Sequence, residues 1–435
     1  MDRKKIKILF TNLMYLNRNY GAQGIALPLM DKLNKYFDAE YTFAIPERYF
    51  ENDILFSREY GFSIVAAEEE SGVFLERGFL VAYILYPIFS LLRTRKLKRI
   101  TKKQKDLYLN LIEKLKESDV VIDLSGIEFV GNCSFLGKWL SYITITYIQR
   151  LAEKYSKPYI KYTKSYGPFH GKVYRFLVKR QLNKLPFVFV RGESNLEEVK
   201  TLNLNVPTFT FPDISVVLEP APKSWAIEYI SSLGMNPSIP IVGISPSAVI
   251  SKITSSNSNS SCGSNHIKLC KKLINFFQSK GRQVLLIPHS LEEKNPESCD
   301  LELSKKIYND LENTSNVFIV PDALDYKKVR AIIGLLDFYI TGRYHSISSA
   351  LSMGIPVVPL SWHMKYQDIM SLFLDDFLAI DCRTTGVEEA FSLIEKYYSN
   401  RQWFNRDKVL EKKEEIIKQI DESIEILVEE LRKYT

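Results

Sequence analysis

Short apolar runs alternate with amphipathic helical segments along nearly the whole chain. Residues 5–12 read as a strand, and within residues 21–36 Ile25, Leu29 and Leu33 recur at helical spacing. Strands that alternate with helices favour a parallel sheet covered by helices on both faces, which is an α/β fold. Further strands of the first half are expected at residues 120–124, 159–164, 187–190 and 208–211.

A proline-rich stretch interrupts this alternation once. Residues 219–240 contain four prolines and no strong strand pattern, so we place a linker there. The sequence therefore predicts an N-terminal domain over 1–220, a C-terminal domain over 240–400 and a final helical segment, 401–435, that could pack back on the first domain. Strands of the second half are expected at residues 241–245, 284–288, 317–320, 338–341, 357–360 and 378–381.

The net charge of +7 comes from one segment. Residues 93–105 hold eight Lys or Arg and no acid, so the rest of the chain is close to neutral and a general nucleic-acid surface is not implied. Residues 79–92, just before, carry no charge. The insertion at about 73–105 could be a buried hairpin or helix followed by a solvated basic helix. It could also be a peripheral membrane contact whose cations face anionic lipid.

Cysteine usage and the start of the chain favour a reducing compartment. The five cysteines form no CxxC pair. Cys262, His266 and Cys270 fall four residues apart, but no clear fourth ligand lies nearby, so reduced thiols are expected and no metal. The first apolar run is too short for a secretory signal. We expect a cytoplasmic protein, with membrane association left open.

The most informative segment is 337–365. It reads as a strand, a turn, a helix that ends at Gly354 and a second strand, which puts Arg343 and His345 where a strand delivers the chain to a helix N-terminus. Free N–H groups at such an end favour an anion, and an arginine adds two parallel donors. A histidine can donate a hydrogen bond or a proton near neutral pH. An ordinary surface ion pair is the alternative.

Polar residues follow several other expected strands. They include Ser165 and Gly167, Arg191, Asp213 at the end of the first half, and His289. Together they would gather at the carboxyl edges of two sheets, and a cleft between such domains is a common ligand site. The Ser-rich residues 251–265 leave one of these edges, either as a disordered loop or as a mobile lid.

On these motifs the chain resembles the polysaccharide pyruvyl transferase family. The Arg-x-His turn with its downstream Gly-x-Pro-Val and Lys is the most specific of them. The sequence departs from the family pattern at residues 124–126, which hold one glycine, and after Gly21. The matching stretches are NRNYGAQGIAL (17–27), DVVIDLSG (119–126), KSYGPF (164–169), FVFVRGESN (187–195), FPD (211–213), VGISPS (242–247), IPHS (287–290) and GRYHSISSALSMGIPVVPLSWHMKY (342–366).

The resemblance implies two Rossmann-like domains in a GT-B-like arrangement with an interdomain cleft, the acceptor on the N-terminal side and the donor on the C-terminal side. It implies transfer of pyruvate from phosphoenolpyruvate to a hydroxyl pair of a cell-surface polysaccharide or its precursor, which a lipid could carry. The products are a pyruvate ketal and phosphate, and no cofactor is implied.

The resemblance places Arg191, Arg343 and His345 at the donor site, and the chemistry of ketal formation suggests further roles. His345 is expected as the acid or as the group that stabilises the departing phosphate, with Arg343 and Arg191 binding the donor. Asp213 and Asp123 are candidate bases for the second hydroxyl. Further substrate-binding residues are expected at Ser346, Lys365, Gly21, Gly167, Ser245 and His289. A solvated lysine and a structural histidine are the alternatives for Lys365 and His289.

Two other functions stay open. A sugar-nucleotide glycosyltransferase would share the architecture, but such enzymes usually add a carboxylate for the donor, and no clear Glu motif follows residues 354–356. A non-catalytic saccharide-binding member of the family is the second alternative. The presence of both Arg343 and His345 argues against lost activity.

Overall fold

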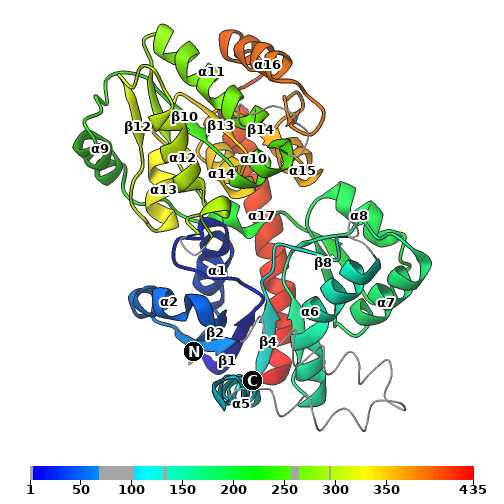
Figure 1. The fold of residues 1–435 in the computed structure, drawn as a ribbon. Coiled ribbons are helices and arrows are strands. Elements are labelled where there is room, and N and C mark those ends of the chain that lie inside the picture. The colour runs from blue at the N-terminus through cyan, green and yellow to red at the C-terminus, as the bar shows by residue number, and fades with distance from the viewer. Residues whose placement is uncertain (1–2, 68–101, 131–134, 256–263, 293–294) are drawn as a thin grey trace. The chain divides into compact units, whose positions relative to one another are not determined.

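A computed structural model describes residues 3–67, 102–130, 135–255, 264–292 and 295–435. Most of the apolar-basic insertion and residues 256–263 of the Ser-rich loop lie outside these residues. The chain divides into two compact units (Figure 1). Unit 1 comprises Met1–Leu16, Leu29–Asp213 and Asp421–Thr435, and unit 2 comprises Asn17–Pro28 and Ile214–Ile420.

Unit 1 is built on a parallel sheet of order β3-β2-β1-β4-β6. Apolar side chains of the sheet pack with those of the helices around them, Leu111 and Leu115 of α5 and Val178 of α7 among them. The strands are β1 (Lys4–Thr11), β2 (Phe37–Pro46), β3 (Ser63–Ala67), β4 (Val120–Asp123) and β6 (Tyr159–Lys161). The helices that contribute to unit 1 are α1 (Tyr20–Leu33, in part), α2 (Glu47–Tyr60), α5 (Lys102–Glu117), α6 (Phe135–Lys154), α7 (Lys172–Leu182) and α8 (Glu193–Lys200).

Two of the strands expected in this sheet pair with each other instead. β8 (Val188–Val190) and β9 (Thr208–Thr210) form a separate two-stranded parallel sheet, and β5 (Ile127–Glu128) pairs with β7 (Ser165–Tyr166) in another. The periodicity identified strands 187–190 and 208–211 but could not give their partners, because pairing depends on contacts between distant residues.

Unit 2 is a six-stranded parallel sheet of order β12-β11-β10-β13-β14-β15. Figure 1 shows α11 and α16 against one face of this sheet and α13 and α14 against the other. The strands are β10 (Ile241–Ser245), β11 (Gln283–Leu286), β12 (Val317–Ile319), β13 (Phe338–Thr341), β14 (Val357–Ser361) and β15 (Ile380–Asp381). The helices are α9 (Lys223–Ser232), α10 (Ala248–Ser255), α11 (Asn265–Ser279), α12 (Asp300–Asn309), α13 (Tyr326–Ile333), α14 (Tyr344–Ser352), α15 (Lys365–Phe373), α16 (Val387–Ser399) and α17 (Arg406–Leu431, whose end belongs to unit 1), with short 3-10 turns η1 (Ile214–Val217), η2 (Pro296–Ser298) and η3 (Arg432–Tyr434, in unit 1).

Both sheets have the strand order of Rossmann-like folds. The first strand of each unit lies inside its sheet, and the order reverses between β1 and β4 in unit 1 and between β10 and β13 in unit 2. Ligands of open α/β sheets bind at the carboxyl ends of the strands where the order reverses. The predicted α/β class with parallel sheets is therefore confirmed. The expected cleft stays a prediction.

Candidate active site

Two helices begin beside each other at the carboxyl edge of the unit 2 sheet. β10 leads into α10 and the neighbouring β13 leads into α14. The approach is so close that a Cβ on Gly342 would lie 2.9 Å from the Ser247 Cβ. Each helix start presents N–H groups and the positive end of the helix dipole. This edge of unit 2 therefore favours an anion.

Arg343 stands at the first turn of α14 and is held by a carboxylate. Its Nε donates to Asp300 Oδ2 at 2.8 Å and its Nη2 to Asp300 Oδ1 at 2.5 Å. Asp300 is fully buried, whereas the Arg343 side chain keeps 23% exposure. The same carboxylate accepts from the backbone N–H of Ala248 at 2.9 Å and of Ser290 at 3.0 Å. Asp300 thus fixes the direction of the guanidinium and ties three loops together.

Sequence reasoning did not find Asp300. It begins α12 eleven residues after His289, without a motif around it. It lies well beyond the expected strand 284–288, in a stretch with several acidic residues, a feature that many loops share.

His345 lies against the start of α1, which belongs to unit 2. A Cβ on Gly21 would lie 2.9 Å from His345 Nδ1, so only glycine leaves room for the ring at its present place. Tyr326 supports this contact, because its hydroxyl donates to the His345 carbonyl at 2.6 Å and its N–H to Gln23 Oε1 at 2.6 Å. The predicted residues Gly21, Arg343 and His345 are thus brought together within one unit.

Two buried imidazoles lie behind this edge. The His289 ring is edge-on to the rings of Tyr20 and Tyr326, at centroid distances of 5.4 and 5.9 Å. Burial, and then the positive charge of Arg343, lowers the pKa of His289 to about 3. His266 Nε2 accepts from the Ser247 N–H at 2.9 Å, and burial with the Arg343 charge lowers its pKa to about 4. Both rings are therefore neutral near pH 7.

The remaining predicted residues of unit 2, Ser346, Ser245 and Lys365, contact other groups of the protein in this structure. Ser346 Oγ is buried and donates to the Arg343 carbonyl at 2.7 Å, and Ser245 Oγ bonds the Tyr339 hydroxyl at 2.7 Å. The Lys365 ammonium lies over the rings of Trp362 and Tyr344, at 4.9 and 5.8 Å from the centroids. Besides Arg343, Lys365 is therefore a second cation of unit 2, at the start of α15.

Arg191, Asp213 and Gly167 belong to unit 1. The Arg191 guanidinium pairs with the Asp213 carboxylate and donates to the Gly126 carbonyl at 2.7 Å, and both charged side chains are buried. In this structure the Asp213 carboxylate therefore has a fixed cationic partner. Gly167 directly follows β7, a strand of the two-stranded sheet β5-β7. The donor role of Arg191 and the base role of Asp213 stay predictions.

A buried charge cluster lies at the carboxyl edge of the unit 1 sheet. Lys161 and Lys164 bind Asp123 and Glu128, with nitrogen–oxygen distances of 2.6 to 2.9 Å and almost no exposure. Burial would raise the pKa of Asp123, but the two ammonium groups hold it well below its usual range. Burial and the Asp123 charge raise the pKa of Glu128. The carboxylate of Asp123, a candidate base, is therefore ionised and paired with Lys161 and Lys164.

The described residues hold neither a metal-binding cluster nor a membrane-spanning helix. No group of three His, Cys, Asp or Glu in the described ranges is placed to hold a metal ion. Among the helices of the described ranges, none has both the length and the hydropathy that spanning a bilayer requires.

A sequence model of the polysaccharide pyruvyl transferase family matches residues 19–364. The chain belongs to this family. The match includes Gly21, Arg343, His345 and Asp300 of unit 2 and most of unit 1, and it ends just before Lys365. The protein is accordingly a transferase of polysaccharide biosynthesis. Among curated proteins, none is significantly similar to the chain.

Solved structures of other transferases and of epimerases share the fold of this pyruvyl transferase family member. TcCGT1 in complex with UDP aligns with a TM-score of 0.55 and 9% identity over 99% of this chain and all of that one. Spinosyn forosaminyltransferase SpnP aligns at 0.52 and 12% over 97% and 99%. UDP-GlcNAc 2-epimerase from Neisseria meningitidis aligns at 0.52 and 10% over 99% and 100%. At such identities the likeness shows the Rossmann-like, GT-B-type fold alone.

Proposed function

We propose that this family member transfers pyruvate from phosphoenolpyruvate to two hydroxyls of a saccharide. The observation that carries the proposal is the joint position of Arg343, His345 and the start of α14 at the strand-order reversal of unit 2. Phosphoenolpyruvate presents a carboxylate and a phosphate on one small molecule. A guanidinium and a helix N-terminus are suitable partners for two such groups.

His345 supplies the proton in this proposal. It protonates the methylene carbon of the enol while one sugar hydroxyl attacks the adjacent carbon. A second hydroxyl then displaces phosphate, which leaves with the electron pair of its C–O bond, and the two hydroxyl protons pass to the surroundings. The result is a cyclic pyruvate ketal and inorganic phosphate. The proposal requires no cofactor.

The family match supports a saccharide acceptor, and we propose a cell-envelope polysaccharide or its precursor, such as an exopolysaccharide repeat unit. We place the reaction in the cytoplasm, where phosphoenolpyruvate is made. If residues 79–105 contact membrane, a lipid-linked precursor is the natural acceptor. Replacing the eight cations of 93–105 by Gln would then abolish binding to anionic vesicles and leave turnover of a soluble acceptor intact. Unchanged vesicle binding would exclude that contact.

The test of the proposed function is phosphoenolpyruvate binding by calorimetry, followed by phosphate release with a panel of saccharides. Wild type should bind, and Arg343→Ala should lose binding by about 10- to 100-fold, since a charge-assisted bidentate contact contributes about 1.5–3 kcal/mol. Arg343→Lys keeps the charge but loses the planar pair of donors, so we expect an intermediate loss.

The outcomes distinguish the alternatives. Phosphate release that depends on Arg343 and His345 supports pyruvyl transfer. Nucleotide release from a sugar nucleotide, without phosphoenolpyruvate binding, would instead favour a glycosyltransferase. If neither donor binds nor turns over, the non-catalytic alternative would replace the proposal.

A further inference from the structure

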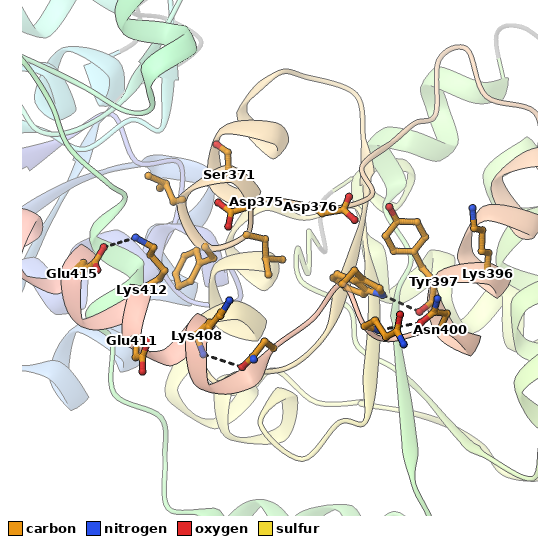
Figure 2. Close-up of a pocket in the computed structure, with 16 residues that line it drawn as sticks. Ser371, Asp375, Asp376, Lys396, Tyr397, Asn400, Lys408, Glu411, Lys412 and Glu415 are labelled. Atoms are coloured by element: carbon orange, nitrogen blue, oxygen red, sulfur yellow. Dashed lines mark hydrogen bonds and ion pairs between the residues drawn. The ribbon is translucent and has the colours of Figure 1, made fainter.

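Unit 2 contains a cavity of about 800 Å³ whose lining includes neither Arg343 nor His345 (Figure 2). It is lined by the end of α15, the end of α16, the loop after α16 and the first turns of α17. Helices of a parallel α/β sheet run opposite to its strands, so the ends of α15 and α16 lie at the amino edge. The bond from Arg401 Nη2 to Asp337 Oδ2, 2.9 Å long and just before β13, confirms that edge. The cavity is therefore separate from the candidate active site.

One wall of the cavity is aromatic and rigid. The rings of Trp403 and Tyr397 lie 5.2 Å apart, and the indole N–H of Trp403 donates to the Tyr397 carbonyl at 3.0 Å. Trp403 also packs against the hydrophobic core of unit 2 while remaining partly exposed. Such a fixed aromatic face can cover the C–H face of a ring-shaped ligand without losing much conformational entropy.

Hydrogen-bonding groups surround this wall. Figure 2 shows Asp375 and Asp376 in the short loop after α15, with Asn400 at the far side near Tyr397. Both carboxylates are exposed, and neither makes an ion pair or a hydrogen bond with a described residue. Carboxylates accept in pairs, and an amide both donates and accepts. This combination matches the vicinal hydroxyls of a sugar.

The charges of the lining argue for an uncharged ligand. Three lysines and four acidic residues line the cavity, so neither sign dominates. Lys412 is already paired with Glu415 at 2.7 Å. A strongly anionic ligand would meet the two free carboxylates, and a cation would meet the lysines. A neutral molecule with many hydroxyls avoids both costs.

We propose that this cavity binds a neutral oligosaccharide through Trp403, Tyr397, Asp375, Asp376 and Asn400. It would hold a stretch of glycan at the sheet edge opposite to Arg343, apart from any reacting hydroxyls. The size fits, since small-molecule sites of proteins enclose about 300–1,000 Å³. The inference concerns binding alone and does not depend on phosphoenolpyruvate as donor.

The test uses the full chain without phosphoenolpyruvate and three neutral probes: maltotetraose, cellotetraose and β-1,4-galactotetraose. Saturation-transfer NMR measures binding, and tryptophan emission reports its place. We expect at least one probe to bind saturably and to change the emission. Trp403→Phe should abolish the emission change while NMR still detects the probe. Asp375→Ala/Asp376→Ala should weaken binding about 10-fold or more, because the probe loses its hydrogen bonds to both carboxylates. The variant should still fold, because both side chains are exposed.

A matched control comes from α16 itself. Glu389 is exposed at the opposite end of this helix, so Glu389→Ala should leave binding unchanged. The proposal is overturned if none of the three probes binds, if the double variant binds as wild type does, or if Glu389→Ala weakens binding equally. Phosphoenolpyruvate is absent throughout, so failure here is distinguishable from failure of the proposed transfer reaction.

Discussion

Asp300 is the residue that gives Arg343 its direction. Asn at this position keeps the size and one acceptor but cannot receive two guanidinium bonds. We expect Asp300→Asn to lower the free energy of unfolding by about 2–4 kcal/mol, because a buried ion pair with further N–H partners is broken. The turnover of the protein that remains folded should also fall, since the Arg343 guanidinium loses its orientation.

Urea unfolding and phosphate-release kinetics separate these two effects. Arg343 is partly exposed, which places the stability loss toward the lower end of the range. The exposed Asp310, at the other end of α12, supplies the control Asp310→Asn, which should change neither quantity. Wild-type kinetics in a folded Asp300→Asn protein would contradict the positioning role.

His289 makes stability depend on pH in a definite direction. Its ordinary pKa of 6.5 falls to about 3 in the folded chain because of burial and the Arg343 charge. Between these values the unfolded chain binds the extra proton, so stability falls as pH drops below 6.5 and the effect is absent above it. We expect His289→Leu to reduce the slope by up to about 1.4 kcal/mol per pH unit.

The measurement is urea unfolding of both proteins at pH 5 and pH 7.5. His266 and the carboxylates also titrate in this window, so only the difference between wild type and variant is informative. Equal slopes in the two proteins would show that the folded His289 ring takes up its proton as readily as the unfolded one.

At the scale of elements, the first turn of α1 sets the place of His345. Gly21→Ala would put a methyl group within 2.9 Å of His345 Nδ1, so the ring must shift. We expect turnover to fall about 10-fold or more, because catalytic groups tolerate little displacement. Gly386→Ala, where an added Cβ meets nothing within 4 Å, is the control and should retain activity. Wild-type turnover in Gly21→Ala would argue against His345 as the acid.

Sequence periodicity was most informative where strands are uniformly buried. Residues 241–245 and 338–341 are apolar runs that became β10 and β13, and the turn after β13 was correctly placed. It was silent over 37–67, where β2 carries Asp38 and Glu40, because tertiary pairing outweighs local preference. The proline-rich stretch 219–240 contains α9, whose start follows Pro222. Asp300 reaches the site only through the fold, so no local pattern marks it. The four-residue spacing that drew attention to His266 suggested a metal ligand and gave no sign of its bond to Ser247.

At the scale of the whole molecule, each unit is assembled from separate stretches of chain. The path passes from one unit to the other at four places, after Leu16, Pro28, Asp213 and Ile420. The segment Asn17–Pro28 completes unit 2, where the Leu291 N–H donates to the Arg18 carbonyl at 3.1 Å. The candidate active site therefore depends on residues that lie more than 300 positions apart.

The end of α17 completes unit 1 in the same way as Asn17–Pro28 completes unit 2. Ile424, Leu427, Val428 and Leu431 are almost fully buried, and the Ser423 hydroxyl bonds the Tyr162 hydroxyl at 3.1 Å. Burying each such aliphatic side chain contributes about 1.5–3 kcal/mol, so removal of Asp421–Thr435 costs about 6–12 kcal/mol, as much as many domains possess. We expect the chain ending at Ile420 to lose the unfolding transition of unit 1 in calorimetry. Glu422→Ala/Glu429→Ala, which changes only exposed side chains of the same stretch, should keep it. A truncated chain with the wild-type transitions would mean that unit 1 closes its core without this helix.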